Sequence, residues 1–277
     1  MTIFDAIIYG LIQGLSEFIP ISSSAHLTLA GHLLGSMNTI SPEKWTAFVA
    51  TIQLGTLLAV IIYFAKEIKT IPIAFLKENL GSGRRKYSEQ SHDSKMGWFI
   101  GLGTVPIVVI GLAIKKIIEG GITKDPIVIG ASLIILAVIL AIAEKVGKFR
   151  KETKDLTMKD ALLVGLAQCL ALIPGASRSG TTITAGMFLG MTRETAAKFS
   201  FLLSIPAVLA SGLLEFYQSL KYITSGEITT LAIATLVSAI SGYLSISFLI
   251  KYLKTRTTYP FVIYRIALGI LVLYYFS

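Results

Sequence analysis

The sequence contains little of what a soluble protein of its size contains. Only 15% of its 277 residues are charged, whereas a typical soluble domain has about 25%. Because there is one cysteine, no internal disulfide is possible, and Cys169 is interpreted as a packing residue rather than a nucleophile. The amino end has no basic segment ahead of its first apolar stretch, so no cleavable signal peptide is expected.

Apolar residues take the place of the missing charge. They make up 53% of the chain, and the mean hydropathy is +0.73. Six segments approach the ~20 residues that an α-helix needs to cross a bilayer. These segments are residues 45–64, 96–114, 126–143, 199–217, 230–250 and 259–276. The composition therefore predicts an all-α integral membrane protein with six transmembrane helices.

Two further apolar regions are interrupted by polar residues. Residues 3–35 contain QGLSEFIPISSSAH, and residues 160–191 contain PGASRSGTT. Each half of these regions is too short to span, and Pro20 and Pro174 stand at the breaks. Irregular backbone at membrane depth requires surrounding protein or a water-filled cavity. We therefore expect two re-entrant helical hairpins rather than two more spans.

The two interrupted regions resemble each other. GLIQGLSEFIPISSS (10–24) aligns with GLAQCLALIPGASRS (165–179) when one gap is allowed. The chain thus divides into repeats at residues 1–144 and 145–277, each with one hairpin and three spans. An odd number of spans turns the second repeat upside down. Inverted-topology repeats with sites on broken helices are a known membrane architecture.

The net charge of +9 comes from basic residues in a few connections between the apolar segments. This distribution is typical of a membrane protein's cytoplasmic loops and argues against a nucleic-acid site. Three alternate connections are basic, and because cytoplasmic loops are enriched in Lys and Arg, both termini are predicted outside. The first hairpin then enters from outside and the second from the cytoplasm, so that their tips can meet. The basic connections contain Lys66, Lys69, Lys77, Arg84, Arg85, Lys86 and Lys95; Lys145, Lys148, Arg150, Lys151, Lys154 and Lys159; and Lys251, Lys254 and Arg256. The other connections contain only Lys115, Lys116, Lys124 and Lys221.

The first hairpin combines an acid, hydroxyls and an imidazole. Gln13 and Glu17 are four residues apart and share one helix face. After Pro20, the hydroxyl residues Ser22, Ser23 and Ser24 are candidates to cap the next helix, and His26 follows in its first turn. The N-terminus of a helix favours an anion.

The second hairpin repeats this pattern with a cation. Gly175 and Gly180 permit tight turns, and Arg178 carries a planar fork suited to phosphate. Arg265, inside the last span, is interpreted as a cation that extends toward the cytoplasmic face. The hydroxyl residues around the second helix start are Ser177, Ser179, Thr181 and Thr182.

The motifs QGLSEFIPISSSAHL and PGASRSGTT resemble the signatures of the undecaprenyl-diphosphate phosphatase family, also called the bacitracin-resistance family. Similarity extends to IQLGTLLAV (52–60), GTVPIVVIGL (103–112) and PFVIYR (260–265). The resemblance implies removal of the terminal phosphate of a polyprenyl diphosphate, which recycles the lipid carrier for cell-wall synthesis. It also implies a divalent cation, Mg²⁺ or Ca²⁺, held at Glu17, with Gln13 standing where the family has Glu or Gln.

The resemblance implies catalytic roles for four residues and substrate contacts for nine. The nucleophile stays open among Ser23, His26 and water, and Ser23 activated by His26 is favoured because a hydroxyl needs an adjacent base. The four catalytic residues are Glu17, Ser23, His26 and Arg178. The substrate contacts are Gln13, Ser22, Ser24, Gly175, Ser177, Ser179, Gly180, Thr181 and Thr182.

A transporter or flippase of an anionic polyprenyl phosphate lipid is the alternative function, because inverted repeats are also transporter features. The cluster of acid, serine and histidine favours chemistry, since anion transport needs no general base. The expected location is the bacterial inner membrane, with the site near the midplane and open to the outer face. The expected partners are the polyprenyl diphosphate and membrane lipids but no nucleic acid, and a homodimer is left open.

Overall fold

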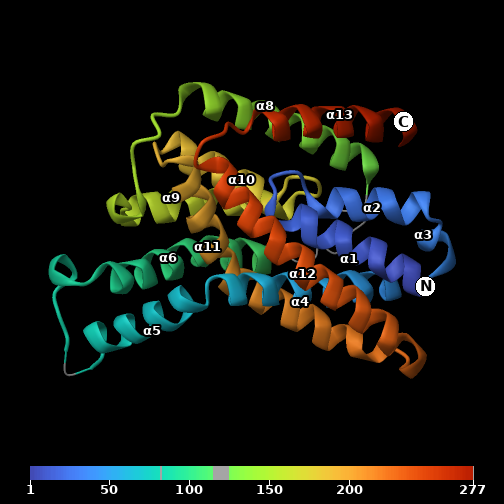
Figure 1. The fold of residues 1–277 in the computed structure, drawn as a ribbon, viewed down its shortest axis with the longest axis horizontal. Helices are drawn as coiled ribbons and strands as arrows, with labels where there is room; N and C mark the ends of the chain where they lie inside the picture. Colours follow the sequence, from blue (N-terminus) through green and yellow to red (C-terminus); the bar gives the residue numbers. More distant parts are fainter. Residues whose placement is uncertain (82, 115–124, 277) are drawn as a thin grey trace.

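The structure, a computed structural model, describes residues 1–81, 83–114 and 125–276, and these are almost entirely helical (Figure 1). Their only extended pairing is an isolated bridge between Lys151 and Met191. The predicted basic positions Lys115, Lys116 and Lys124 lie outside the described residues. The α-helices in chain order are α1 (Ile3–Phe18), α2 (Ser23–Leu33), α3 (Ser36–Thr39), α4 (Pro42–Tyr63), α5 (Ala65–Asn79), α6 (His92–Ala113), α8 (Pro126–Val146), α9 (Met158–Gln168), α10 (Arg178–Phe188), α11 (Arg193–Ser219), α12 (Ile228–Leu253) and α13 (Tyr259–Phe276).

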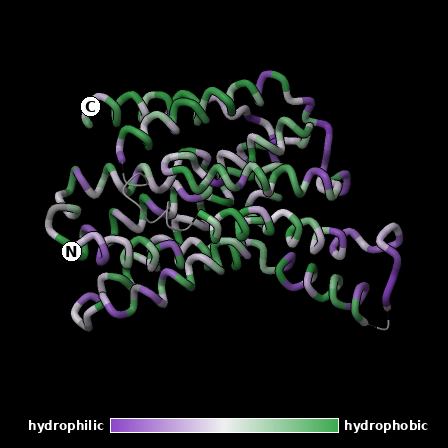
Figure 2. Tube along the Cα trace, turned by 180° about the vertical axis from the view of Figure 1, so that it is seen from behind, coloured by the Kyte–Doolittle hydropathy of each residue, from purple (hydrophilic) through white to green (hydrophobic). Residues whose placement is uncertain are grey.

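Six of these helices are long and apolar enough to cross a membrane, which confirms the six predicted segments. They are α4, α6, α8, α11, α12 and α13. Hydrophobic residues run along them, and hydrophilic residues gather at the connections (Figure 2). Helices α6 and α11 begin several residues before their apolar parts, because the side chains of Ser91 and Thr192 cap them. The chain is therefore a multi-pass membrane protein.

Both interrupted regions are pairs of short helices, as predicted. Helix α1 ends at Phe18, and α2 starts at Ser23 after four residues of irregular chain. In the second region, α9 passes into the 3₁₀ turn η4 (Cys169–Leu172) before the break that leads to α10. Each of these helices is shorter than a span. The re-entrant path through a bilayer and the inverted relation of the repeats stay predictions.

Close helix packing fixes where the two breaks lie. Helix α1 is packed so tightly on α12 that a Cβ at Gly14 would stand 2.0 Å from the Ser241 hydroxyl. The hydroxyls of Ser241 and Ser245 donate to the carbonyls of Gly10 and Leu15, at 3.3 and 3.0 Å. Helix α9 is held against α6 in the same manner, since a Cβ at Gly165 would meet the backbone of Gly103.

The basic connection after α4 is not the simple loop that the sequence predicted. It contains α5, a helix of 15 residues, which forms with the start of α6 an arm that projects from the rest of the molecule (Figure 1). Glu78 near the end of α5 accepts a hydrogen bond from the backbone N–H of Ser91 at 2.8 Å, which closes this arm. Its charged residues interrupt the apolar residues, so the sequence of α5 shows no long apolar run.

Candidate functional site

The helices that follow the two breaks begin with the same unusual backbone. Ser22 has φ 76° and ψ 98°, and Ser177, which caps the helix after the second break, has φ 66° and ψ 107°. The Ser22 hydroxyl accepts from the backbone N–H of Ala25 at 3.4 Å, and the Ser177 hydroxyl accepts from that of Gly180 at 3.2 Å. Positive φ is uncommon for residues other than glycine and is concentrated at functional sites. The predicted caps are therefore present in both regions.

The two breaks are in direct contact, although about 160 residues of sequence separate them. The Nη2 of Arg178 on α10 donates to Oε1 of Glu17 on α1 at 2.7 Å. The Ser179 hydroxyl donates to the carbonyl of Ile19 at 3.2 Å. The two breaks therefore meet, and an acid from one region and a cation from the other form an ion pair.

Glu17 forms hydrogen bonds with three other residues of the site. Its Oε2 accepts hydrogen bonds from the Ser23 hydroxyl at 2.6 Å and from the Gln13 amide at 3.1 Å. The side chains of Glu17 and Arg178 are only 8% and 15% exposed, so their pairing is weakly screened by water. Four of the predicted residues thus form one cluster, in which the Glu17 carboxylate can accept the proton of the Ser23 hydroxyl.

His26 is held by two other groups. Its Nδ1 lies 2.6 Å from the carbonyl oxygen of Ser22, and its Nε2 lies 2.6 Å from the hydroxyl of Tyr264 on α13. Among the described contacts, the Ser23 hydroxyl is bonded to Glu17 and not to His26. The favoured pairing of Ser23 with His26 as its base is therefore not the arrangement in this structure.

Arg265 does not extend toward a membrane face, and that interpretation is wrong. The side chain is completely buried, and it donates to the carbonyls of Pro20 at 3.4 Å and Ala176 at 3.0 Å, one in each break. A Cβ at Gly180 would lie 2.6 Å from its Nη1, which explains the glycine there. Its Nε has no hydrogen-bond partner among the described residues. Arg265 thus fastens the two breaks together and adds a positive charge beneath them.

Other predicted substrate contacts have structural partners. The hydroxyls of Thr181 and Thr182 donate to the carbonyl of Arg178 at 3.0 and 2.8 Å, and that of Thr182 also pairs with Ser200 at 2.6 Å. The space beside Gly175 is filled by α8, since a Cβ would stand 2.4 Å from the Ser132 hydroxyl. These residues shape the second break, and their contacts with substrate stay predictions.

The exposed Ser24 and the buried Ser179 each form a hydrogen bond with the N-cap serine of the same helix. Ser24 pairs with the Ser22 hydroxyl at 3.1 Å, and Ser179 pairs with the Ser177 hydroxyl at 3.2 Å. Ser24 lies at the open side of the site, where a ligand has access to it. This pairing gives both helix starts the same row of hydroxyls.

A divalent cation has few protein ligands at this site. The described residues contain no group of three or more His, Cys, Asp or Glu side chains that could hold a metal. Glu17, the amide of Gln13 and the hydroxyl of Ser23 are oxygen donors, which suit Mg²⁺ or Ca²⁺. Since Mg²⁺ commonly takes one or two carboxylates and completes its shell with phosphate and water, the donor set fits an ion that arrives with a diphosphate.

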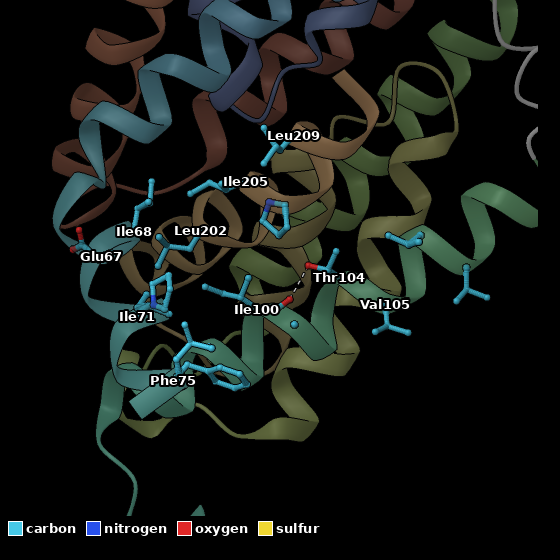
Figure 3. A pocket seen from close by; sticks show the side chains of 17 residues that line it. Glu67, Ile68, Ile71, Phe75, Ile100, Thr104, Val105, Leu202, Ile205 and Leu209 are labelled. Atoms are coloured by element: carbon cyan, nitrogen blue, oxygen red, sulfur yellow. Dashed lines mark hydrogen bonds between the residues drawn. The ribbon is translucent and has the colours of Figure 1, made fainter. Parts of the chain in front are cut away.

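An apolar groove of about 830 Å³ lies between α5, α6 and α11 (Figure 3). Its lining is apolar except for Glu67 and Thr104. Leu202 and Ile205 of α11 form part of its wall, and the carbonyl of Ser204 between them accepts from Nη1 of Arg178 at 3.5 Å. The groove is separate from the polar cluster but shares α11 with it.

Known proteins are similar to this chain over almost its whole length. The sequence model of the family described as bacitracin resistance protein BacA matches residues 6–271. An undecaprenyl-diphosphatase of Syntrophobacter fumaroxidans is 56% identical over 97% of this chain and 95% of the relative. Proteins with the same name from Chloroherpeton thalassium and Chlorobaculum tepidum are 50% and 47% identical, over 99% and 98% of this chain and 96% and 95% of their own lengths.

Proposed function

The chain belongs to the BacA family of bacitracin resistance proteins, and we propose that it removes the terminal phosphate of undecaprenyl diphosphate within the bacterial inner membrane. The name that its relatives carry supports this reaction. The observation that carries the proposal is the partly buried contact of Glu17 with Ser23 and Arg178. It places a proton acceptor, a hydroxyl and a phosphate-binding cation together at two helix N-termini.

The diphosphate binds between these N-termini. The free N–H groups at the starts of α2 and α10, together with Arg178 and the buried Arg265, give the pocket a positive potential. Arg178 exchanges Glu17 for phosphate oxygens, which its planar fork matches. Substrate binding thereby releases Glu17 from its ion pair and leaves it as a stronger proton acceptor.

The phosphoanhydride is cleaved by displacement at the terminal phosphorus. In this proposal the Ser23 oxygen attacks, its proton passes to Glu17, and the bond to the bridging oxygen breaks, releasing undecaprenyl phosphate. Water then gives a proton to Nε2 of His26 and attacks the phosphoserine phosphorus, Glu17 returns its proton to the Ser23 oxygen as the P–O bond breaks, and inorganic phosphate is released. Arg178 and the helix N-termini stabilise the negative charge on the transferring group. A divalent cation bound by Glu17 and the substrate would add further charge stabilisation.

The undecaprenyl tail occupies the apolar groove beside the site. A polyprenyl chain needs an apolar path out of a polar pocket, and the wall formed by Leu202 and Ile205 is on the helix that Arg178 contacts. The lining of the groove offers almost no hydrogen-bonding groups. Burial of each methylene there contributes about 0.8 kcal/mol to binding.

The membrane arrangement is part of the proposal. The two broken regions enter from opposite faces as re-entrant hairpins of inverted repeats, and both termini are outside. The site lies near the midplane and opens to the outer face. The contact between Glu17 and Arg178 supports two tips that meet, and the basic connections support the orientation.

Phosphate release by purified protein in detergent tests the function. Detergent removes the two sides of the membrane, so only an enzyme produces inorganic phosphate from undecaprenyl diphosphate there. A protein that releases none, yet moves a polyprenyl phosphate across liposomes, is the flippase of the alternative hypothesis. The inactive control is Glu17→Gln.

A further inference from the structure

Tyr264 is the residue of α13 that touches the catalytic imidazole. Its hydroxyl lies 2.6 Å from Nε2 of His26, and the planes of the two rings are within 2° of parallel. It stands next to Arg265, which fastens the two breaks, so its position relative to α2 is tightly constrained. The contact joins residues 238 positions apart in the sequence.

The two contacts of His26 define which nitrogen carries the proton. The Ser22 carbonyl can only accept a hydrogen bond, so Nδ1 must donate to it and therefore carries the hydrogen. In a neutral imidazole Nε2 is then the acceptor, and the Tyr264 hydroxyl is the donor. The second group that orients a histidine fixes its tautomer in this way at many catalytic sites.

The lone pair of Nε2 is the only proton-accepting position on a His26 held like this. The charged side chains at the two breaks are Glu17 on α1, Arg178 on α10 and Arg265 on α13. Within the described residues, their hydrogen bonds go to each other, to Ser23, to Gln13 or to backbone carbonyls, and none goes to the imidazole. Among the described residues, the Tyr264 hydroxyl is therefore the side-chain group that occupies this lone pair.

We propose that Tyr264 is a positioning residue, which holds the Nε2 lone pair of His26 in place, while the Ser22 carbonyl fixes the Nδ1–H tautomer. Tyr264 is 44% exposed, so it stands at the edge of the cluster. Its hydroxyl keeps the imidazole in place until a water or phosphate oxygen takes over the hydrogen bond at Nε2. This role rests on the proposed phosphatase reaction only for its effect on turnover.

The test replaces the hydroxyl and keeps the ring. Tyr264→Phe is compared with Tyr274→Phe, a change on the same helix at a side chain that is 82% exposed. Nitrogen-15 NMR of histidine-labelled protein reports the tautomer, and with only three histidines in the chain, His26→Asn assigns the signal. Turnover and KM for undecaprenyl diphosphate are measured on the same samples.

Tyr264→Phe is expected to keep the Nδ1–H form of His26, which the Ser22 carbonyl fixes, but to move the nitrogen-15 resonance of Nε2 because its hydrogen bond is lost. It should also lower turnover about tenfold with KM unchanged, a fraction of the 10²–10⁴ that a positioned acid–base group contributes. Tyr274→Phe should change neither. Unchanged turnover in Tyr264→Phe, or lost turnover with the Nε2 resonance of His26 unmoved, would overturn the proposal. If wild-type protein releases no phosphate, the proposed function fails, and the NMR comparison still decides whether Tyr264 holds His26.

Discussion

At the scale of single residues, Glu17 pairs with Arg178 before substrate binds and accepts the Ser23 proton afterwards. A variant without this carboxylate should therefore bind the diphosphate but fail to cleave it. Glu17→Gln keeps the shape and the hydrogen bonds but loses the proton acceptor, so we expect phosphate release to fall by about 10²–10⁴. Arg178 is left buried without its acid, so a diphosphate analogue should raise the melting temperature of the variant at least as much as that of wild type. Near-normal turnover, measured by phosphate release in detergent, would remove Glu17 from the mechanism.

Gln13 offers a test of the divalent cation. The Gln13 amide donates to Glu17 at 3.1 Å, and Gln13→Glu would replace that bond with two carboxylates one helical turn apart. Like charges in such a pair repel unless a cation lies between them. We therefore expect Gln13→Glu to keep or raise activity at millimolar Mg²⁺ and to need less Mg²⁺ for half-maximal turnover. A Mg²⁺ titration beside wild type measures this, and an unchanged midpoint would argue against a cation at Glu17.

The polar residues of the cluster could be predicted from sequence, but their partners could not. Glu17, Ser23 and Arg178 were recognisable because acids, hydroxyls and arginine are costly in apolar segments and stood at helix breaks. Arg265 was misinterpreted because a cation some six residues inside a span looks like one that reaches for the membrane surface. Its carbonyl partners, Pro20 and Ala176, are defined only once the two breaks are folded together. Tyr264 gave no signal at all in a helix with several aromatic residues.

At the scale of helices, hydropathy located the six long elements and prolines located the two breaks. The helix starts differed by several residues, because capping by Ser91 and Thr192 rather than hydropathy determines where α6 and α11 begin. Helix α5 was missed because its charged residues conceal an amphipathic segment. Its apolar face forms one wall of the groove, so this omission also hid the proposed place of the tail.

Two glycines of α6 form a matched pair to test the groove. A Cβ at Gly101 or at Gly111 would meet no atom within 4 Å, but only Gly101 lines the groove. Gly101→Leu should displace a few methylene groups of the tail, worth about 0.8 kcal/mol each, and raise KM for undecaprenyl diphosphate roughly tenfold. A short prenyl diphosphate should be hydrolysed as by wild type, and Gly111→Leu should behave as wild type with both substrates. Equal effects of the two variants would exclude the groove as the tail site.

At the scale of the whole molecule, an ion pair joins the first and second repeats at one end. Lys44 at the start of α4 donates to Glu227, just before α12, at 2.9 Å. The backbone N–H and hydroxyl of Thr224, followed by Lys44, lower the pKa of Glu227 from its ordinary 4.5 to about 2. Because the folded pKa is the lower one, this contribution is complete above about pH 4.5 and is lost as the pH falls toward 2.

Glu227→Gln should therefore destabilise the protein at neutral pH and lose the difference from wild type in acid. The two side chains are 37% and 42% exposed, so the effect is small, about 1 kcal/mol or less. Melting temperatures between pH 7 and pH 3 measure it, with Glu89→Gln in the exposed 3₁₀ turn η1 (Tyr87–Glu89) as the control. A difference that grows toward low pH would contradict the assignment.

The orientation of the two halves follows from counting crossings, and it can be tested with single cysteines. Ser88, between α4 and α6, and Gly226, between α11 and α12, occupy corresponding connections of the two repeats, and both are exposed. Helices α6, α8 and α11 cross between them, so a re-entrant α9–α10 pair leaves an odd number of crossings and opposite sides. If that pair crossed the membrane as one further span, the number would be even and the sides would be the same. The first connection also carries Arg84, Arg85 and Lys86, whereas Lys221 is the cation beside the second.

In a Cys169→Ala background, Ser88→Cys should react with an impermeant thiol reagent only from the cytoplasmic side, and Gly226→Cys only from outside. Labelling of both from one side would show that the repeats are parallel, and the second broken region would then have to span the membrane.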